Sequence, residues 1–214
     1  MIARGWDDSR LEMPLSSERA EARLGGGLAP AVPPRAEVEH LRHELAEAQA
    51  KIAELERRAD VDPLLDILNR RGFERELTRS LAYVKRYGTP AALVYVDLDG
   101  FKAVNDQHGH AAGDTLLKAV ACELTAHVRA SDVVARLGGD EFGVLMWNVS
   151  GPQAGVRARE LENRIEWLSL AQGPARLGVG ASAGVALLQP ERDAAGTIDA
   201  ADQAMYARKK ERRP

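Results

Sequence analysis

The spacing of apolar residues along the chain predicts five helices and four strands. Apolar positions that recur every three or four residues are typical of one buried helix face, and short unbroken apolar runs between turn residues are typical of buried strands. The predicted helices cover residues 36–60, 73–88, 116–128, 158–168 and 197–212. The predicted strands cover residues 91–98, 133–137, 142–147 and 179–188.

The order of these elements predicts the fold class. After the first helix the order is α-β-α-β-β-α-β-α, which contains the β-α-β-β-α-β unit of ferredoxin-like domains. The two strands on either side of Gly138-Gly139 are close enough in sequence to form a hairpin with a tight turn. We therefore predict an α+β domain over residues 61–214, with an antiparallel central sheet flanked by helices.

The first 60 residues have a different character. Residues 1–35 are rich in Gly, Pro, Ser and charged residues, so we expect them to be disordered. Residues 36–60 contain no Gly or Pro, and Asp62-Pro63 follows as a helix breaker. Their apolar seam alternates steps of three and four and predicts a dimerising coiled coil, or else a single amphipathic helix lying on the domain. The seam consists of Val38, Leu41, Leu45, Ala48, Ile52, Leu55 and Ala59.

Composition and charge exclude several classes of function. The 214 residues carry a formal net charge of -3, so no basic surface for nucleic acid is expected. No apolar run approaches the roughly 20 residues that span a bilayer, and the first ten residues do not resemble a signal peptide. We therefore expect a cytoplasmic protein. Cys122 is the single cysteine, which excludes an internal disulfide, and its helical pattern predicts a small buried core residue.

Acidic residues follow two of the predicted strands. Asp97 ends the strand 91–98, and Asp140 and Glu141 stand at the hairpin turn. Neighbouring strands in the middle of the sheet would bring these carboxylates together, and grouped carboxylates repel unless a cation lies between them. Oxygen ligands without His or Cys favour Mg²⁺. Alternatively, each acid is only a solvated residue at the end of a strand.

The hairpin turn and five other segments resemble the GGDEF family of diguanylate cyclases. Gly138-Gly139-Asp140-Glu141-Phe142 reproduces the family's signature. The resemblance covers residues 61 to about 210 and implies a nucleotidyl-cyclase-like fold and the condensation of two GTP into cyclic di-GMP and two pyrophosphates. The other segments are Asn69-Arg70-Arg71, Asp97 to Asp106, Gly109 to Asp114, Ser182 to Ala186 and Ala201 to Tyr206.

The resemblance implies roles for the acidic residues. Asp97, Asp140 and the backbone carbonyl of Leu98 match the family's ligands of Mg²⁺, with Mn²⁺ as an alternative ion. Either Asp140 or Glu141 matches the base that activates the ribose 3′-hydroxyl, and the sequence comparison favours Asp140. Lys102 matches a catalytic lysine at the phosphates.

Further positions match the family's contacts with GTP. Asn105 and Asp114 match its guanine ligands, and an Asp suits guanine because it accepts from N1–H and the N2 amino group, which adenine lacks. Alternatively, Asp114 is a helix cap, His110 a structural histidine, the glycines an ordinary turn, and the basic residues a solvated tail. The matching positions are Asn105, His110, Asp114, Gly138, Gly139, Lys209 and Arg213.

Arg129 and Asp132 form an Arg-x-x-Asp pattern, and five residues separate Asp132 from Gly138. The family's inhibitory product site has this pattern at this offset, which implies feedback inhibition by cyclic di-GMP. An Arg fork suits guanine O6 and N7, and an Asp suits the N1/N2 edge. Alternatively, the two residues form a surface ion pair at a helix end.

The chain departs from the family at its N-terminal motif, which usually reads Asp-x-Leu-Thr-Gly-Leu-x-Asn-Arg. Leu65 and Asp66 replace the Thr and the Gly. Arg212 likewise stands where the family has a Gly near the C-terminus. The first departure puts the transmission of activation in doubt more than the chemistry.

Three functions remain open at this point. The first is a cyclase whose GTP-bound half-sites face each other in a homodimer. The second is a catalytically silent module that binds GTP or cyclic di-GMP and acts through protein partners. The third is a structural adaptor built on the coiled coil. The presence of all the matching acids favours the first.

Overall fold

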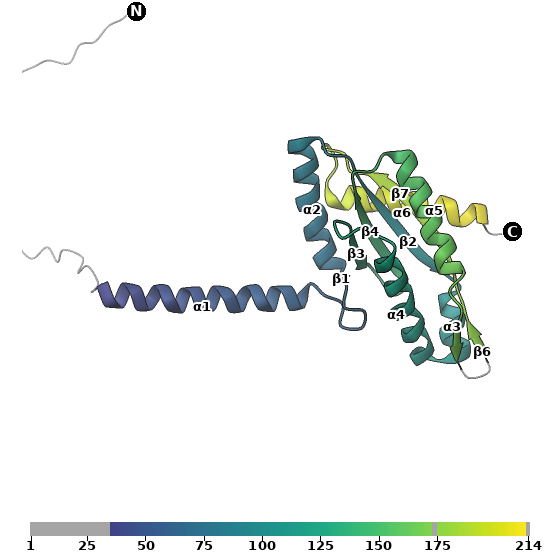
Figure 1. Ribbon diagram of the computed structural model, residues 1–214, viewed down its shortest axis with the longest axis horizontal. Helices are drawn as coiled ribbons and strands as arrows, with labels where there is room; N and C mark the ends of the chain where they lie inside the picture. Colours follow the sequence, from purple (N-terminus) through teal and green to yellow (C-terminus); the bar gives the residue numbers. More distant parts are fainter. Residues whose placement is uncertain (1–34, 173–174, 213–214) are drawn as a thin grey trace, which may run out of the picture. The chain divides into compact units, whose positions relative to one another are not determined.

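The computed structural model describes residues 35–172 and 175–212, and the chain divides into two compact units, Met1–Ala48 and Gln49–Pro214 (Figure 1). The second unit contains a five-stranded sheet in the order β1-β3-β4-β2-β7. All neighbours in this sheet are antiparallel except β1 and β3. The strands are β1 (Leu68–Asn69), β2 (Ala91–Asp99), β3 (Val133–Arg136), β4 (Glu141–Trp147) and β7 (Gly180–Leu187).

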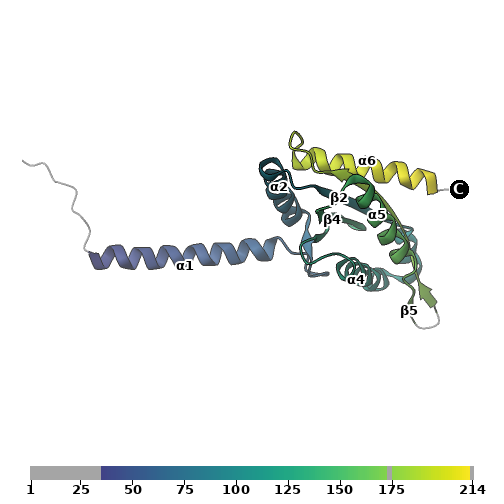
Figure 2. The ribbon, with the colours of Figure 1, turned by 45° about the horizontal axis from the view of Figure 1, so that its top comes forward.

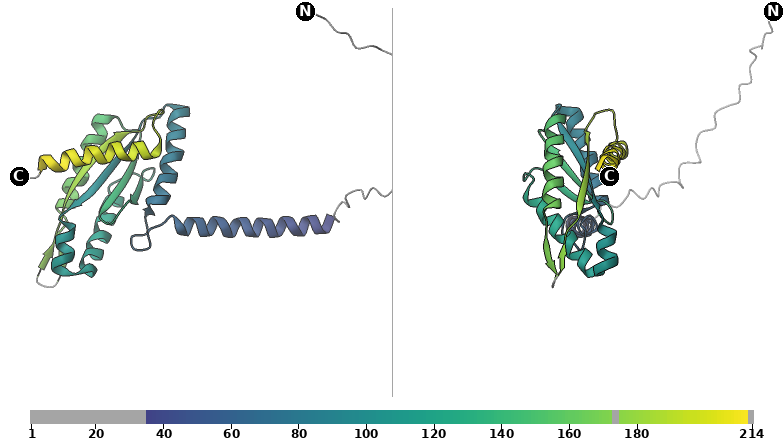
Figure 3. Two further views of the ribbon diagram at one scale, coloured as in Figure 1. Left: turned by 180° about the vertical axis from the view of Figure 1, so that it is seen from behind. Right: turned by 90° about the vertical axis from the view of Figure 1, so that its right-hand side faces the viewer.

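Helices cover both faces of this sheet, which confirms the predicted fold class. One face carries α2 (Arg70–Tyr87) and α6 (Ala194–Arg212), and the other carries α4 (His110–Ala126) and α5 (Gly151–Glu166) (Figures 2 and 3). The central strand β2 is buried on both sides, because alternate residues contribute to two separate apolar clusters. This explains why β2 reads as a continuous apolar run.

Four elements were not predicted, and each is short or weakly patterned. The edge strand β1 has two residues, and α3 (Phe101–His108) buries only Phe101 and Val104. A small hairpin of β5 (Leu170–Gln172) and β6 (Ala175–Leu177) forms a second sheet. Segments of this length do not give a clear hydrophobic period.

The predicted burial of Cys122 is wrong. The side chain is exposed, although Val120 and Leu124 on the same helix are fully buried. A residue two positions from Val120 is turned about 200° around the helix axis, so Cys122 faces away from the sheet.

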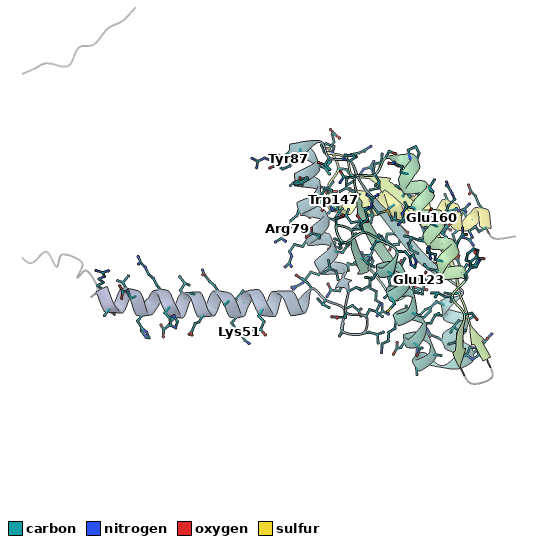
Figure 4. The ribbon with its side chains drawn as sticks, viewed as in Figure 1. Lys51, Arg79, Tyr87, Glu123, Trp147 and Glu160 are labelled. Carbon is teal, nitrogen blue, oxygen red and sulfur yellow. The ribbon has the colours of Figure 1, made fainter. Side chains whose placement is uncertain are left out.

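The first predicted helix is present as α1 (Arg35–Ala59), and charged side chains stand along it, Lys51 among them (Figure 4). Leu41, Leu45 and Ile52 of its apolar seam are more than half exposed. An exposed seam of this kind is what a partner helix would cover, but the dimer itself stays a prediction. The segment 1–35, predicted to be disordered, lies outside the described residues except for Arg35.

The loop between α1 and β1 turns around Asp62. Its Oδ1 atom accepts the backbone N–H groups of Leu64 and Leu65 at 2.9 and 3.0 Å. Asp66 then adopts a left-handed conformation, with φ of 55°. This conformation explains why the family usually has Gly at this position, since only Gly adopts it without a steric cost.

We expect Asp66→Gly to raise the free energy of unfolding by about 0.5 kcal/mol, because relief of the left-handed strain exceeds the added entropy of the unfolded chain. The midpoint of thermal unfolding should rise by about 1–2 °C. Asp66→Ala is the control and should lower the midpoint, since alanine tolerates this conformation less well than aspartate. A lower midpoint for the glycine variant would contradict the prediction.

Candidate active site

Three carboxylates meet where β2 ends and β4 begins. Asp97 and Glu141 are direct cross-strand partners, and the backbone N–H of Leu98 donates to the carbonyl of Asp140 at 3.1 Å. Asp97 lies on the sheet face that α6 covers, because it contacts Lys209 of that helix. The strands therefore bring together the acids that the sequence analysis selected.

The electrostatics of this group favour a cation. Burial raises the pKa of Asp140, and the negative charge of Asp97 raises it further. The Lys209 ammonium contacts the Asp97 carboxylate and lies 3.4 Å from Oδ1 of Asp99. Burial alone would lower the pKa of Lys209, but its hydrogen bond to Asp97 and the charges of Asp97 and Asp99 raise it. The Lys209 ammonium therefore already neutralises part of the negative charge of these carboxylates.

Glu141 is surrounded differently from Asp140. Its Oε2 atom lies 3.9 Å from Nη2 of Arg70, and the buried Tyr95 stands diagonally across the two strands from it. Burial raises the pKa of Tyr95, and the charge of Glu141 adds to the increase. A Cβ atom on Gly138 would lie only 2.1 Å from Oε2 of Glu141. Gly138 therefore leaves the space that this carboxylate occupies.

Two arginines to which the sequence analysis assigned no role in the site contact the backbone of the hairpin turn. Arg136 donates from Nε to the carbonyl of Gly138 at 3.0 Å and from Nη2 to that of Gly139 at 2.8 Å. Its Nη1 atom also pairs with Asp62 at 3.2 Å, and Nε of Arg70 donates to the Leu137 carbonyl at 2.7 Å. Arg136 could have been recognised from the sequence, because it is a charged residue within the otherwise apolar strand 133–137.

A pocket of about 300 Å³ opens beside these acids, toward α6. Its lining combines carboxylates with cationic side chains, as a site for a bound phosphate and metal would need. The lining residues are Asp97, Glu141, Asp202, Met205, Tyr206, Lys209 and Lys210.

The residues matched to guanine lie on α3 and α4, the helices that follow β2. Oδ1 of Asn105 would lie 2.0 Å from a Cβ atom on Gly113, so the Asn105 side chain reaches the residue that precedes Asp114. Asn105 is half-buried, whereas His110 and Asp114 are exposed. The two helices therefore bring Asn105 and Asp114 to neighbouring positions.

The match to known proteins covers the whole globular part of the chain. The family described as "Diguanylate cyclase, GGDEF domain" matches residues 59–214. The chain belongs to this family. The predicted membership, reached from the motifs, is confirmed.

The GGDEF domain is similar to several curated and solved relatives. It is 39% identical over 168 residues to the probable diguanylate cyclase DgcE of Escherichia coli K12 and 37% identical over 175 residues to the diguanylate cyclase TpbB of Pseudomonas aeruginosa. Each match covers 78% of this chain but only 15% and 39% of those proteins. The crystal structure of the coiled coil and GGDEF domain of DgcB from Caulobacter crescentus, in complex with c-di-GMP, matches with a TM-score of 0.71 and 25% identity, covering 83% of this chain and 95% of that one.

The GGDEF domain has a second pocket, of about 380 Å³, lined by Arg129, Asp132 and residues of α5. Asp132 accepts the backbone N–H of Arg129 at 3.0 Å through Oδ2 and that of Trp147 at 3.0 Å through Oδ1. These bonds place the predicted Arg-x-x-Asp pair at the mouth of a cavity.

The protein side chains near Asp97 would supply only some of the ligands of a bound metal ion. Within residues 35–172 and 175–212, no three His, Cys, Asp or Glu side chains are grouped as a metal site. Two carboxylates and a backbone carbonyl still suit Mg²⁺, which usually takes its other ligands from water and phosphates. The mutual repulsion of Asp97 and Asp140 is consistent with that fit.

Two further residues were predicted to contact phosphate, Lys102 and Arg213. Lys102 is exposed on α3, one residue after Phe101. Arg213 lies outside the described residues.

None of the helices in the described part of the chain is long and apolar enough to cross a membrane.

Proposed function

We propose that this chain is an active diguanylate cyclase that condenses two GTP into cyclic di-GMP and two pyrophosphates in the presence of Mg²⁺ or Mn²⁺. The observation that carries the proposal is the meeting of Asp97, Asp140 and Glu141 at one end of the sheet, beside Lys209. We place the reaction in the cytoplasm, where GTP is available.

Asp97, Asp140 and the carbonyl of Leu98 are the proposed ligands of the divalent cation. Bound there, the cation would supply the positive charge that phosphoryl transfer needs at the triphosphate. Lys102, Lys209 and Arg213 are the proposed additional phosphate contacts.

Asn105 and Asp114 are the proposed guanine ligands, with His110 beside them. The Asp114 carboxylate would accept from N1–H and the N2 amino group of guanine, and the Asn105 amide can both donate and accept. Adenine offers no matching donor edge, so the pair would select GTP over ATP.

Gly139 supports the presence of a nucleotide at the turn. Its φ is not positive, and a Cβ atom there would meet nothing within 4 Å. The protein's own packing therefore gives no reason for glycine at this position. Close approach of a substrate to the backbone gives one.

The sequence comparison favoured Asp140 as the base, but we propose Glu141 instead, because Asp140 is already a proposed ligand of the cation. Both acids lie near Asp97, Asp140 close enough for the charge of Asp97 to raise its pKa and Glu141 as the direct cross-strand partner, and Glu141 also lines the pocket beside Lys209 and lies 3.9 Å from Arg70. In the reaction the 3′-oxygen of one GTP bonds to the α-phosphorus of the other, its proton passes to Glu141, and the α–β phosphoanhydride bond breaks. Two facing half-sites complete the ring, so turnover needs a dimer.

The assay for the proposal is incubation of the full chain with GTP and Mg²⁺, with product separated by chromatography. Formation of cyclic di-GMP and release of pyrophosphate, with ATP unreactive, is the expected result. Binding of cyclic di-GMP without any synthesis, at protein concentrations that support dimers, would instead make the chain a silent binding module.

We predict that the seam of α1 mediates dimerisation. A Leu45→Asp/Ile52→Asp variant should be monomeric, and its turnover at submicromolar protein should fall at least about tenfold because tethering raises the local concentration of half-sites. Sedimentation and the GTP assay measure both effects. Ala46→Asp/Ala50→Asp, on the opposite side of the helix, is the control, and a dimeric seam variant would refute the prediction.

Product inhibition at the pocket of Arg129 and Asp132 is a further part of the proposal. Arg129→Ala should raise the cyclic di-GMP concentration for half-inhibition about tenfold or more, because a bidentate contact to guanine is lost. The measurement is the initial rate against added product. Arg159→Ala, an exposed arginine on α5, should leave the inhibition curve unchanged. An unchanged curve for Arg129→Ala would remove this site from the proposal.

A further inference from the structure

The last two turns of α6 are attached to the domain differently from the rest of the helix. The buried residues of α6, which the structure describes in full, are Thr197, Ile198, Ala201 and Met205. Every later residue of the helix is exposed or half-buried, so apolar packing against the sheet ends at Met205. Helix ends fray, because their last carbonyl groups have no partner within the helix. The final turns therefore need another means of attachment.

Arg212, the final residue of α6, makes three contacts with neighbouring elements. Its Nη1 atom donates to the carbonyl of Ala181 on β7 at 2.8 Å and lies 3.5 Å from Oε2 of Glu162. Its Nη2 atom donates to Oε2 of Glu166 at 3.0 Å. Both glutamates belong to α5, so one guanidinium joins the end of α6 to a helix and a strand. The Arg212 side chain is 26% exposed, so these contacts are partly shielded from water and salt.

The Ala181 carbonyl gives this attachment a fixed direction. β7 is an edge strand of the five-stranded sheet and pairs only with β2 in it. The outer side of an edge strand carries backbone groups without a ladder partner. Arg212 binds such a carbonyl at Ala181, and Glu162 accepts the nearby N–H of Ala183 at 2.8 Å. A planar guanidinium bonded to a strand and to carboxylates holds its orientation better than a flexible ammonium would.

Lys209 lies in the turn that Arg212 ends. The two residues are three apart, so they project from neighbouring parts of one helix face. Lys209 reaches Asp97 and Asp99 on β2 and lines the pocket of about 300 Å³. It lies about one turn beyond Met205, the last buried residue of the helix. The position of the Lys209 backbone therefore depends on the polar contacts at the end of α6.

We propose that Arg212 is a positioning residue that anchors the last turn of α6 and thereby holds Lys209 at the pocket. The inference rests on the proposed function and deepens it, since Lys209 is a proposed phosphate contact there. Arg212 stands where the family usually has a Gly, a residue that often follows the end of a helix. An arginine lets the helix continue and adds an anchor that glycine has no side chain to provide.

The effect should appear in KM for GTP rather than in kcat. Arg212→Gln removes the guanidinium but keeps a good helix former, so the fold should be retained. A lysine that binds the triphosphate equally in the ground and transition states contributes to KM, so we expect KM to rise about fivefold and kcat to change less than about twofold. The rise stays moderate because Arg208 still lies 3.3 Å from Glu162. Partial unfolding would instead lower the apparent kcat, leave KM unchanged and contradict the proposal.

A double-mutant cycle tests whether Arg212 acts through Lys209. In a Lys209→Gln background the same substitution should change KM by less than about 1.5-fold. An equal rise in both backgrounds would mean that Arg212 acts independently of Lys209, which overturns the positioning role while the cyclase activity stands. Arg159→Gln, at an exposed arginine of α5, is the control for the loss of one positive charge and should keep the KM of wild type.

Hydrogen exchange measures the anchor without any turnover. The backbone amides of residues 206–212 should exchange about tenfold faster in Arg212→Gln than in wild type or Arg159→Gln, because the released turn opens more often. Mass spectrometry of the C-terminal peptides measures the rates. Equal exchange in all three proteins would overturn the proposal. A wild type that makes no cyclic di-GMP would overturn the proposed function, whereas the exchange rates would still decide whether Arg212 anchors the helix.

Discussion

Asp140→Asn is expected to lower the rate of cyclic di-GMP formation by at least about 10³-fold and to leave the fold intact. Asparagine has nearly the shape of aspartate but carries no charge, so the proposed metal site would lose one of its two carboxylates. Losing a group that stabilises developing charge in a transition state typically costs 10²–10³-fold, and a metal ligand also affects substrate binding. The GTP assay at saturating Mg²⁺ measures the loss.

The same substitution should not lower stability. The pKa of Asp140 is raised above its ordinary value of 3.8, so the folded protein binds this proton more tightly than the unfolded chain does. The contribution of Asp140 to stability is therefore present below pH 3.8 and is lost as the pH rises through the raised value. At neutral pH the charged form costs stability, and the asparagine variant should unfold at the same temperature as wild type or a higher one.

Asp199→Asn is the matched control, because Asp199 is an exposed acid of α6. It should keep both the turnover and the unfolding temperature of wild type. Retained turnover in Asp140→Asn would remove this residue from the catalytic machinery. A large fall in its unfolding temperature would mean that Asp140 is a structural acid.

Glu162→Ala is expected to lower the free energy of unfolding by about 2 kcal/mol, since a buried N–H left without its acceptor costs about 1–3 kcal/mol and two partly exposed arginines also lose their partner. The Glu162 side chain is 2% exposed, and Oε1 accepts the backbone N–H of Ala183 at 2.8 Å. Oε2 lies 3.3 Å from Arg208 and 3.5 Å from Arg212, both on α6. The hydrogen bond and the charge of Glu162 raise the pKa of Arg208. One carboxylate thus joins α5, β7 and α6.

Urea unfolding of Glu162→Ala and Glu162→Gln measures this contribution. Glutamine keeps an acceptor for Ala183 but loses the charge, so it should be less destabilising than alanine. Glu160→Ala is the control on the same helix, because Glu160 is exposed and pairs with the likewise exposed Arg157, which should limit the loss to about 1 kcal/mol. Equal stability of Glu162→Ala and Glu160→Ala would contradict the role assigned to this carboxylate.

The long elements of the fold were predictable because their apolar patterns are strong. Helix α2 has a clear amphipathic period, and strand β2 is an unbroken apolar run between turn residues. The pattern could not reveal β1, whose two residues pair in parallel with β3, because a strand of that length has no period. It also placed Cys122 inside, since small apolar residues occur on both faces of a helix.

The sequence predicted which residue types the site contains but not how they are arranged. The acids at positions 97, 140 and 141 were identified from strand ends and from the family motif. The arginines at positions 70 and 136 were not, because their partners lie more than 60 residues away or at backbone carbonyls.

By itself, the sequence determined the order of the elements, the family and the acids that the site would contain. Only the tertiary structure decided how these acids differ. The pKa of Asp140 is raised by burial and by the charge of Asp97, whereas Glu141 faces Asp97 across the strands, lines the pocket beside Lys209 and lies 3.9 Å from Arg70. The physical reason is that burial, hydrogen bonding and neighbouring charge depend on which strands and helices lie side by side, and adjacent residues of one turn can receive opposite environments.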